Sequence, residues 1–403
     1  MSAGTQCKAS SKAEVSDPVT IGAQLIDRIR SLAPKFRERA QAAEQARQLP
    51  AESVNELIDA GIIRILIPQR FGGYGLSVDT WFDVVREISK ADASHGWCAS
   101  LLIHHPHYLG QFPREAQQEV WAGGPDVPIA ASIIPVAQVK PADGGYRLSG
   151  HSPFASGIGH SRWVFIGALV EEPTGPPQWT LFLVRPGEYT VVDTWFTAGM
   201  CATGSNTIVT DNVFVPKHRT LRLSEMVEGR GPGGAVNENP IFRAPLVTYA
   251  PLSFVAPMLG AAQGAYEYFR DWTRTRKGAR GVMIAELAST QHRMARVAAD
   301  LDAAELLLRR AVDICPAVRP ASLDLRARAL RDFSRSAEIA VGCIDTLIAM
   351  SGSAGFAASN PIQRAWRDIH FASMHVSLNF ENNFTHFGRL EFGLPRDPHL
   401  PFY

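Results

Sequence analysis

The stretch that decides the fold lies near the C-terminal end of this 403-residue chain. Residues 351–356 read SGSAGF, residues 360–370 read NPIQRAWRDIH, and a helical run that carries His375 follows. Residues 380–386 then read FENNFTH, in which Glu381 is the acidic side chain. The pattern predicts that this end of the chain is largely helical.

The spacing of apolar residues divides the whole chain into helical, strand-rich and helical parts. Helical spacing runs through residues 19–122, with a Pro- and Gly-rich loop at residues 66–75. Short alternating runs separated by turn residues fill residues 127–215. They predict an antiparallel sheet or barrel of about six to eight strands. After a Gly-rich linker at residues 229–234, helical spacing returns over residues 251–276, 294–311 and 323–350.

These patterns predict an α+β protein of three domains after a disordered lead-in. The domains are an N-terminal helical domain, a central β-barrel or sheet domain and a C-terminal helical domain. The predicted ranges, with the lead-in first, are residues 1–18, 19–125, 126–235 and 236–403.

The composition narrows the class of protein. The formal net charge is +1 and 46% of the residues are hydrophobic, so neither nucleic acid nor an anionic membrane is an expected partner. No membrane-spanning run and no secretory signal is expected, and the protein is predicted to be cytoplasmic. The cysteines are predicted to be reduced and mostly buried, and no metal site is expected. They are Cys7, Cys98, Cys201, Cys315 and Cys343.

Four segments, the last of them within the C-terminal stretch, carry a resemblance to a known family. They are residues 91–106 (ADASHGWCASLLIHHP), 148–157 (LSGHSPFASG), 199–206 (GMCATGSN) and 367–389. Together with the C-terminal stretch, their order and spacing resemble the acyl-CoA dehydrogenase superfamily over nearly the whole chain. Within it, they resemble the oxygenase components of two-component flavin-dependent monooxygenases. The resemblance implies the acyl-CoA dehydrogenase fold, in which the C-terminal helical domain is a four-helix bundle.

Two departures from family patterns accompany this resemblance. The dehydrogenases carry a Glu-Gly-Thr segment with their catalytic carboxylate where residues 380–386 read FENNFTH, so the dehydrogenation base is expected to be missing. Many relatives carry Gly-Leu-Arg-Gly-Thr-Gly-Ser where residues 199–205 read GMCATGS, so Cys201 replaces an arginine and any contact that it makes.

The resemblance implies a specific reaction. Such an enzyme takes reduced FMN or FAD from a separate NAD(P)H-dependent flavin reductase. It then uses O2, through a C4a-(hydro)peroxyflavin, to hydroxylate a small aromatic substrate, here expected to be a phenol. Because no GxGxxG or P-loop pattern stands in a strand–turn–helix context, the chain is not expected to bind NAD(P)H itself. Relatives of this kind are homotetramers, and the same assembly is expected here.

Three other functions stay open at this stage. One is an acyl-CoA dehydrogenase-like flavin oxidoreductase that uses Glu381. Another is an N- or S-oxygenase of the same superfamily. The last is a non-catalytic protein with a flavin-binding fold.

The resemblance assigns catalytic roles to three residues. Ser156 matches the family serine that bonds the flavin N5 region, and a hydroxyl suits this role because it donates and accepts without charge. His105 and His375 match family histidines, and a histidine can take a proton from a phenol or release one. Each of these side chains could instead have a purely structural role.

The resemblance also implies binding residues. Thr203 and Ser205 are expected to bond the flavin, and Arg276, ahead of Arg274, to contact it with a guanidinium group. The expected substrate-binding residues are Ser132, Trp97 and Phe154. The alternatives are a loop or strand-end role for the hydroxyls, a solvated face for the arginines and simple core packing for the aromatic rings.

Overall fold

The structure, a computed structural model, describes residues 17–278, 281–314, 321–397 and 400. The predicted disordered lead-in at residues 1–18 lies outside these residues except for its end. There, the Asp17 side chain accepts hydrogen bonds from the backbone N–H groups of Val19 and Thr20 and caps the first helix. Pro18 occupies the first helical turn, where its missing N–H is not needed.

Five helices form the N-terminal part of the fold. Helix α4 is buried along its whole length, as expected of a helix with apolar residues on all sides. It packs against α3, the C-terminal helix α7 and strand β1, so it lies at the centre of the molecule. The five helices are α1 (Pro18–Ala46), α2 (Ala51–Asp59), α3 (Val78–Ser89), α4 (Ala93–Gln111) and α5 (Arg114–Trp121).

A seven-stranded sheet with the order β5-β6-β2-β1-β3-β4-β7 follows. The prediction of a purely antiparallel sheet was wrong, because β1 pairs with β3 in parallel. Strand β2 lies between β1 and β6, and β3 pairs with the other edge of β1 after a connection that returns the chain to the start of β1, so that β1 and β3 run in the same direction. The strands are β1 (Ile129–Ala142), β2 (Gly145–Ala155), β3 (Trp163–Val170), β4 (Gln178–Val184), β5 (Thr190–Val192), β6 (Asn206–Pro216) and β7 (Thr220–Arg222).

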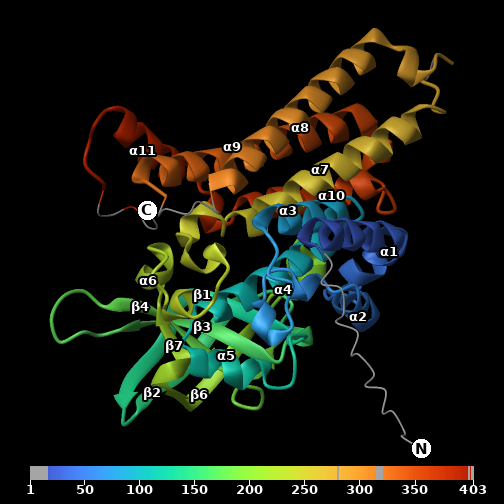
Figure 1. The fold of residues 1–403 in the computed structure, drawn as a ribbon. Coiled ribbons are helices and arrows are strands. Elements are labelled where there is room, and N and C mark those ends of the chain that lie inside the picture. The colour runs from blue at the N-terminus through green and yellow to red at the C-terminus, as the bar shows by residue number, and fades with distance from the viewer. Residues whose placement is uncertain (1–16, 279–280, 315–320, 398–399, 401–403) are drawn as a thin grey trace, which may run out of the picture.

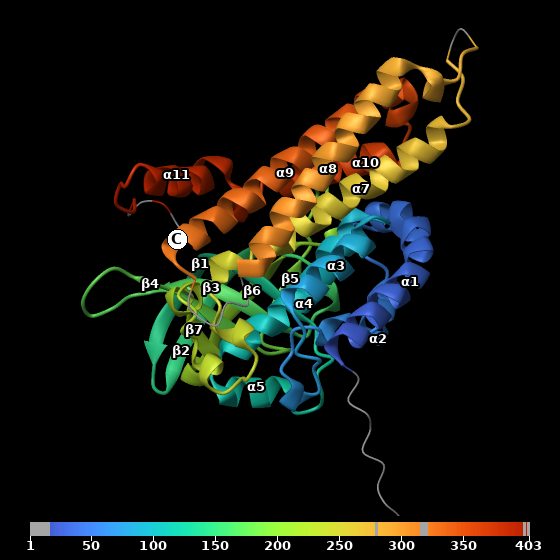
Figure 2. The ribbon, with the colours of Figure 1, turned by 45° about the horizontal axis from the view of Figure 1, so that its top comes forward.

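The C-terminal part is helical again. Figures 1 and 2 show α7, α8, α9 and α10 packed side by side as a long bundle that extends away from the sheet. Helix α11 packs on one end of α9. The short α6 (Leu223–Val227) precedes α7 (Leu252–Thr273), α8 (Ala288–Ile314), α9 (Leu323–Ser351), α10 (Pro361–Ser373) and α11 (Phe380–Glu391). The expected order of helical, β and helical parts is confirmed.

The Gly-rich stretch at residues 229–234 is not the simple linker that the sequence predicts. It leads into a short 3-10 helix, Pro232–Ala235, that packs against α4. A Cβ atom added at Gly233 would lie 2.0 Å from the carbonyl oxygen of Gly110. The glycine is therefore needed because the backbone approaches α4 too closely for any side chain.

Two helical stretches are long and apolar enough to cross a membrane by length and composition, although the sequence analysis expected none. In the first, Leu246–Thr273, 89% of the apolar window is buried inside the protein, as in the core helix of a soluble protein. In the second, Leu323–Phe356, 39% of the window is buried. The second stretch therefore leaves apolar surface uncovered within one chain.

Cys98, Cys201 and Cys343 are free and buried, as predicted. Cys7 and Cys315 lie outside the described residues.

Candidate active site

A turn after strand β2 presents the central hydroxyl of the candidate site. Ser156 follows Ala155 at the end of β2 and precedes Gly157, whose φ of +70° is the left-handed conformation that glycine tolerates. The Gly157 N–H donates to the Thr203 carbonyl at 2.8 Å, which ties this turn to the loop before β6. Ser156 is partly exposed, so its hydroxyl can reach a ligand.

Ser156 belongs to a chain of hydrogen bonds between side chains. The Trp97 indole N–H donates to the Ser156 oxygen at 3.2 Å. The Ser156 and Ser205 oxygens are 2.7 Å apart, and so are those of Ser205 and Thr203. The Thr203 hydroxyl then donates to the Met200 carbonyl at 2.8 Å. The structure therefore brings together Trp97, Ser156 and the loop that carries Thr203 and Ser205, three parts of the chain that the sequence places far apart.

Met200 is held by residues from two other parts of the chain. Its φ of +54° is unusual for a residue with a side chain. The Asp368 carboxylate accepts the Met200 N–H at 2.6 Å, and the Trp195 indole N–H donates to the Met200 carbonyl at 3.0 Å. These two bonds fix the end of the hydroxyl chain.

Asp368 was not among the expected site residues, although it lies in the quoted RDIH segment. Its carboxyl group is fully buried, and burial, followed by the nearby Asp92 charge, raises its pKa to about 7. No sequence signal connects Asp368 to Met200, because the contact spans 168 positions in the chain.

His105 lies on α4 with its ring almost completely buried. Its Nδ1 atom lies 2.8 Å from the Ile129 carbonyl oxygen at the start of β1. Because a carbonyl can only accept, Nδ1 carries the proton and Nε2 keeps a free lone pair when the ring is neutral. Burial lowers the pKa of His105 to about 4, so the neutral form is present near pH 7. This tautomer has a base at Nε2.

His375 packs in an aromatic cluster with residues of two helices. Its ring stacks on Phe254 of α7 with 3.5 Å between the ring centroids. Trp97 of α4 contacts both rings, at centroid distances of 6.0 Å from His375 and 5.0 Å from Phe254. Burial lowers the pKa of His375 to about 3, so this ring is also neutral near pH 7. Phe254 joins this cluster although it carries no sequence motif.

Ser132 and Phe154 lie near the same turn but in different environments. The Ser132 hydroxyl donates to the Pro153 carbonyl at 2.6 Å and is buried. Phe154 has a φ of +64° and is 56% exposed, so within this chain it forms an open surface rather than a closed wall.

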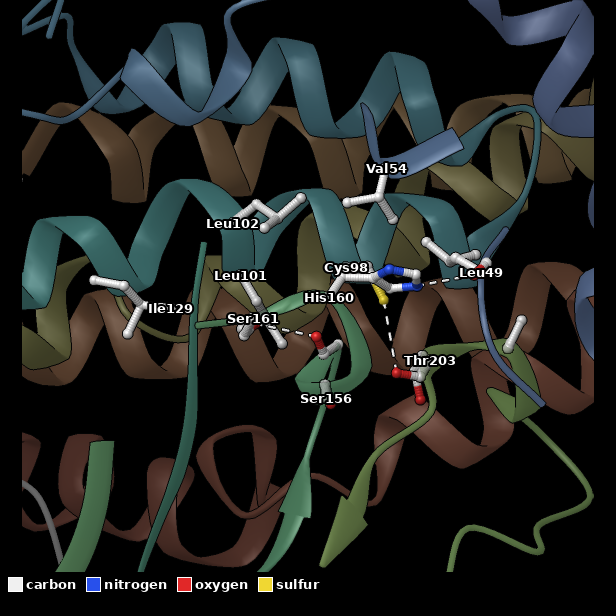
Figure 3. A pocket seen from close by; sticks show the side chains of 12 residues that line it. Leu49, Val54, Cys98, Leu101, Leu102, Ile129, Ser156, His160, Ser161 and Thr203 are labelled. Atoms are coloured by element: carbon white, nitrogen blue, oxygen red, sulfur yellow. Dashed lines mark hydrogen bonds between the residues drawn. The ribbon is translucent and has the colours of Figure 1, made fainter. Parts of the chain in front are cut away.

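A cavity adjoins Ser156 on the side of α4, and Figure 3 shows side chains from the helical part and the sheet around it. Its apolar walls include Leu101 and Leu102 of α4, opposite the turn that carries Ser156. The full lining is Leu49, Val54, Cys98, Leu101, Leu102, Ile129, Ser156, Gly157, His160, Ser161, Ala202 and Thr203.

Arg274 and Arg276 are not brought to the hydroxyl chain within this protomer. They follow the C-terminal end of α7, which points away from the sheet in Figures 1 and 2. Arg274 is 68% exposed beside Asp271, and the Arg276 guanidinium lies over the Trp272 ring at 3.7 Å.

Three other histidines have structural surroundings. His104 bonds Ser253 through Nδ1 at 2.5 Å, and burial places its pKa well below the ordinary value. His107 stacks on Phe242 with 4.9 Å between the ring centroids. His370 bonds the exposed Asp345 at 2.9 Å.

Glu381, the carboxylate that a dehydrogenase would need, is exposed in the first turn of α11. Among the described residues, no group of three or more His, Cys, Asp or Glu side chains is arranged to hold a metal ion.

Comparison with known proteins defines the class first. Residues 23–124 match the N-terminal domain of the acyl-CoA dehydrogenases, and residues 252–380 match their C-terminal domain. The protein therefore has the acyl-CoA dehydrogenase fold.

The relatives narrow this class. The oxygenase subunit HsaA of a flavin-dependent monooxygenase from Mycobacterium tuberculosis (strain ATCC 25618 / H37Rv) is 35% identical, over 91% of this chain and 95% of that protein. Its crystal structure matches with a TM-score of 0.88, covering 93% of this chain and 98% of that chain. The oxygenase component of an FADH(2)-dependent resorcinol hydroxylase from Rhizobium sp. (strain MTP-10005) is 36% identical, over 92% and 94% of the two chains.

A solved structure of XiaF from Streptomyces sp., in complex with FADH2 and glycerol, is 27% identical and has a TM-score of 0.86. It covers 96% of this chain and 99% of that chain. The chain belongs to the oxygenase components of the two-component flavin-dependent monooxygenases. Its cofactor is a flavin, as predicted.

Proposed function

We propose that this oxygenase hydroxylates a small phenol, using reduced flavin delivered by a separate NAD(P)H-dependent reductase. Two relatives support the substrate class, because resorcinol and p-hydroxyphenylacetate, in the names of hydroxylases from Rhizobium and Acinetobacter baumannii, are both phenols. The observation that carries the proposal is the contact of His105 Nδ1 with the Ile129 carbonyl oxygen, because it leaves Nε2 of the neutral ring without a proton and able to accept that of a phenol.

Each site residue has a role in this proposal. Bound reduced flavin, once it has reacted with O2, supplies the oxygen atom and the redox chemistry. Ser156 bonds the N5 edge of the ring, with Ser205 and Thr203 behind it. Trp97 closes the site together with His375, and the neutral His375 provides a second proton-transfer group.

Substrate contacts complete the proposal. Ser132 has its only proton committed to the Pro153 carbonyl, so it can only accept, and because the phenol proton goes to His105, the donor to Ser132 must be a second polar group of the substrate. Phe154 supplies an apolar surface, and its exposed ring fits a face that a ligand covers. Burial of His105 and the apolar cavity walls exclude water from this region.

The residues fit a flavin ring on the chain's own geometry. A partly exposed hydroxyl with buried hydroxyls behind it suits a polar ring edge, and flat aromatic groups suit the ring faces. The phosphate-bearing part of the cofactor needs positive charge, for which Arg276 and Arg274 are the proposed residues. Because both lie apart from Ser156 in one chain, we place them at the site of a neighbouring protomer.

The homotetramer and the cytoplasmic location belong to the proposal too. Apolar side chains that are strongly exposed in one chain support the assembly, among them Leu306 on α8 at 70%, Met374 after α10 at 79% and Phe392 after α11 at 83%. Light scattering is expected to give a mass of four chains, and the mass of one 44.0 kDa chain would contradict the assembly.

The test is single-turnover oxidation of the protein loaded with reduced FMN or reduced FAD and mixed with oxygen and a panel of phenols. We expect one hydroxylated product per flavin oxidised with the correct phenol and flavin. Reoxidation without product from every phenol would contradict the proposal. An acyl-CoA that reduces bound oxidised flavin would instead support a dehydrogenase, against which the exposed Glu381 already counts.

A further inference from the structure

The hydroxyl chain behind Ser156 has a direction that follows from counting protons. The Met200 carbonyl can only accept, and Thr203 gives it its single hydroxyl proton. The bond between Thr203 and Ser205 must then be donated by Ser205. The proton of Ser205 is now used, so Ser156 must donate to Ser205.

Trp97 acts on the same hydroxyl from the other side. An indole N–H can only donate, so the Trp97 contact uses one lone pair of the Ser156 oxygen. Ser156 then donates its proton to Ser205 and accepts one hydrogen bond from Trp97. Its second lone pair is what remains for a ligand.

The hydroxyl chain ends at the Met200 carbonyl, and its buried surroundings make the direction of its hydrogen bonds difficult to reverse. Thr203 and Ser205 are 2% and 3% exposed, which keeps bulk water from replacing either partner. The Met200 backbone is held through its N–H by Asp368, while its carbonyl also accepts from Trp195. In a reversed chain, the Met200 carbonyl would keep the Trp195 indole N–H and the Thr203 backbone N–H as donors, but the Thr203 hydroxyl oxygen would face the carbonyl oxygen at 2.8 Å with no proton between them, which is unfavourable.

We propose that Trp97, Ser205 and Thr203 are positioning residues that present Ser156 to the flavin N5 atom as a hydrogen-bond acceptor. Reduced flavin carries a hydrogen on N5 and can donate to this lone pair. Oxidised flavin has only a lone pair at N5, so two acceptors face each other unless the chain reverses. The site thereby discriminates between the two redox forms of its cofactor. This inference rests on the proposed contact between Ser156 and N5.

The experiment measures the affinity of the full-length, flavin-free protein for oxidised and dithionite-reduced FAD and FMN by anaerobic titration. In Ser205→Ala, the Ser156 proton is released from the chain and can point at the N5 of oxidised flavin. We expect the Kd for oxidised flavin to fall about 2- to 10-fold, the effect of one neutral hydrogen bond, while the Kd for reduced flavin changes less. A tenfold change in the ratio corresponds to about 30 mV in the midpoint potential of the bound flavin for a two-electron couple.

Matched variants separate this effect from general damage. Thr203→Val is expected to act in the same direction as Ser205→Ala, whereas Thr203→Ser keeps the hydroxyl and should restore the wild-type ratio. Ser161→Ala is the control, since Ser161 borders the same cavity but donates to the Gly157 carbonyl and stands outside the chain. Trp97→Phe removes the donor at the other end and is expected to loosen the position of Ser156.

The outcomes distinguish this inference from the function on which it rests. If Ser205→Ala weakens both redox forms equally, its role is merely structural and the inference is wrong. If the ratio does not change in Ser205→Ala but does in Ser156→Ala, Ser156 contacts the flavin without being directed by the chain. If Ser156→Ala changes neither affinity, the contact with N5 itself is wrong, and the proposed placement of the flavin fails first.

Discussion

The turn at Ser156 and the end of α7 at Arg276 differ in how far one chain prepares them for a cofactor. At the turn, four side chains and a backbone carbonyl already form a continuous set of hydrogen bonds with a defined direction. At the end of α7, Arg276 lies on the Trp272 ring and Arg274 stands beside Asp271, mostly in solvent.

The difference follows from burial. A neutral hydroxyl can be buried and oriented by partners of the same chain at little cost, because each bond satisfies a donor and an acceptor. A guanidinium group waiting for an anionic ligand stays at the surface, because burying an unpaired charge is much more expensive. We infer that the ring site is organised within one protomer and that the charged site is completed on assembly.

The largest effect is expected at the base on α4. His105→Asn keeps a donor for the Ile129 carbonyl but has no basic nitrogen, so hydroxylation should fall about 10²- to 10⁴-fold in single-turnover product assays. The affinity for reduced flavin should change less than about twofold, since His105 is not part of the hydroxyl chain. His104→Asn is the matched control, because His104 bonds Ser253 instead. A His105→Asn enzyme that forms product at the wild-type rate would remove the base from the mechanism.

Acidification should lower the free energy of unfolding through the buried His107. Burial lowers the pKa of His107 to about 3, below the ordinary value of 6.5. The stabilisation that this gives is complete above pH 6.5 and is lost as the pH falls from 6.5 toward 3, because the unfolded chain takes up the proton first. Between pH 7 and pH 4.5, the free energy of unfolding should drop by roughly 2 to 3 kcal/mol for such a group.

Urea denaturation of the wild type and of His107→Leu at both pH values measures this contribution. The variant should lose less stability on acidification than the wild type. Equal pH dependence in the wild type and in His107→Leu would show that His107 is not kept neutral by burial.

The turn itself should govern how efficiently oxygen use yields product. Ser156→Ala removes the hydroxyl at the proposed N5 contact, and we expect about tenfold less product per flavin oxidised, within the range of a lost hydrogen bond to a reacting group. Ser152→Ala, on the same strand but buried, should keep the wild-type yield. An unchanged yield in Ser156→Ala would mean that the hydrogen-bonded turn at Ser156 does not contribute to the reaction.

The smallest effect on activity or binding is expected from the two arginines that follow α7. Arg276→Ala should weaken reduced-flavin binding a few-fold, about 1 kcal/mol, and added salt should reduce the difference. Arg274→Ala should have less effect, because its exposed pairing with Asp271 leaves it screened by solvent. If neither variant alters flavin affinity in the assembled protein, other residues bind the phosphate-bearing part of the cofactor.

Much of the fold could be predicted because it depends on local periodicity. Helical spacing was expected over residues 251–276 and 323–350, and α7 (Leu252–Thr273) and α9 (Leu323–Ser351) occupy these ranges. The parallel pairing of β1 and β3 could not be read from the chain, since strand order depends on which edge of β1 each neighbour takes. The Gly-rich stretch was misjudged because its close approach to α4 is a contact over long sequence distance.

The sequence by itself determined the family and the kinds of chemical group at the site, because the motifs containing Trp97, Ser156 and Ser205 are short local patterns that name residue types. Only the tertiary structure decided what those groups do to one another. Met200 and Asp368 lie 168 positions apart, yet their bond anchors the chain that orients Ser156. The direction of a hydrogen bond depends on every partner in the chain, and those partners meet only when the helices and the sheet pack together.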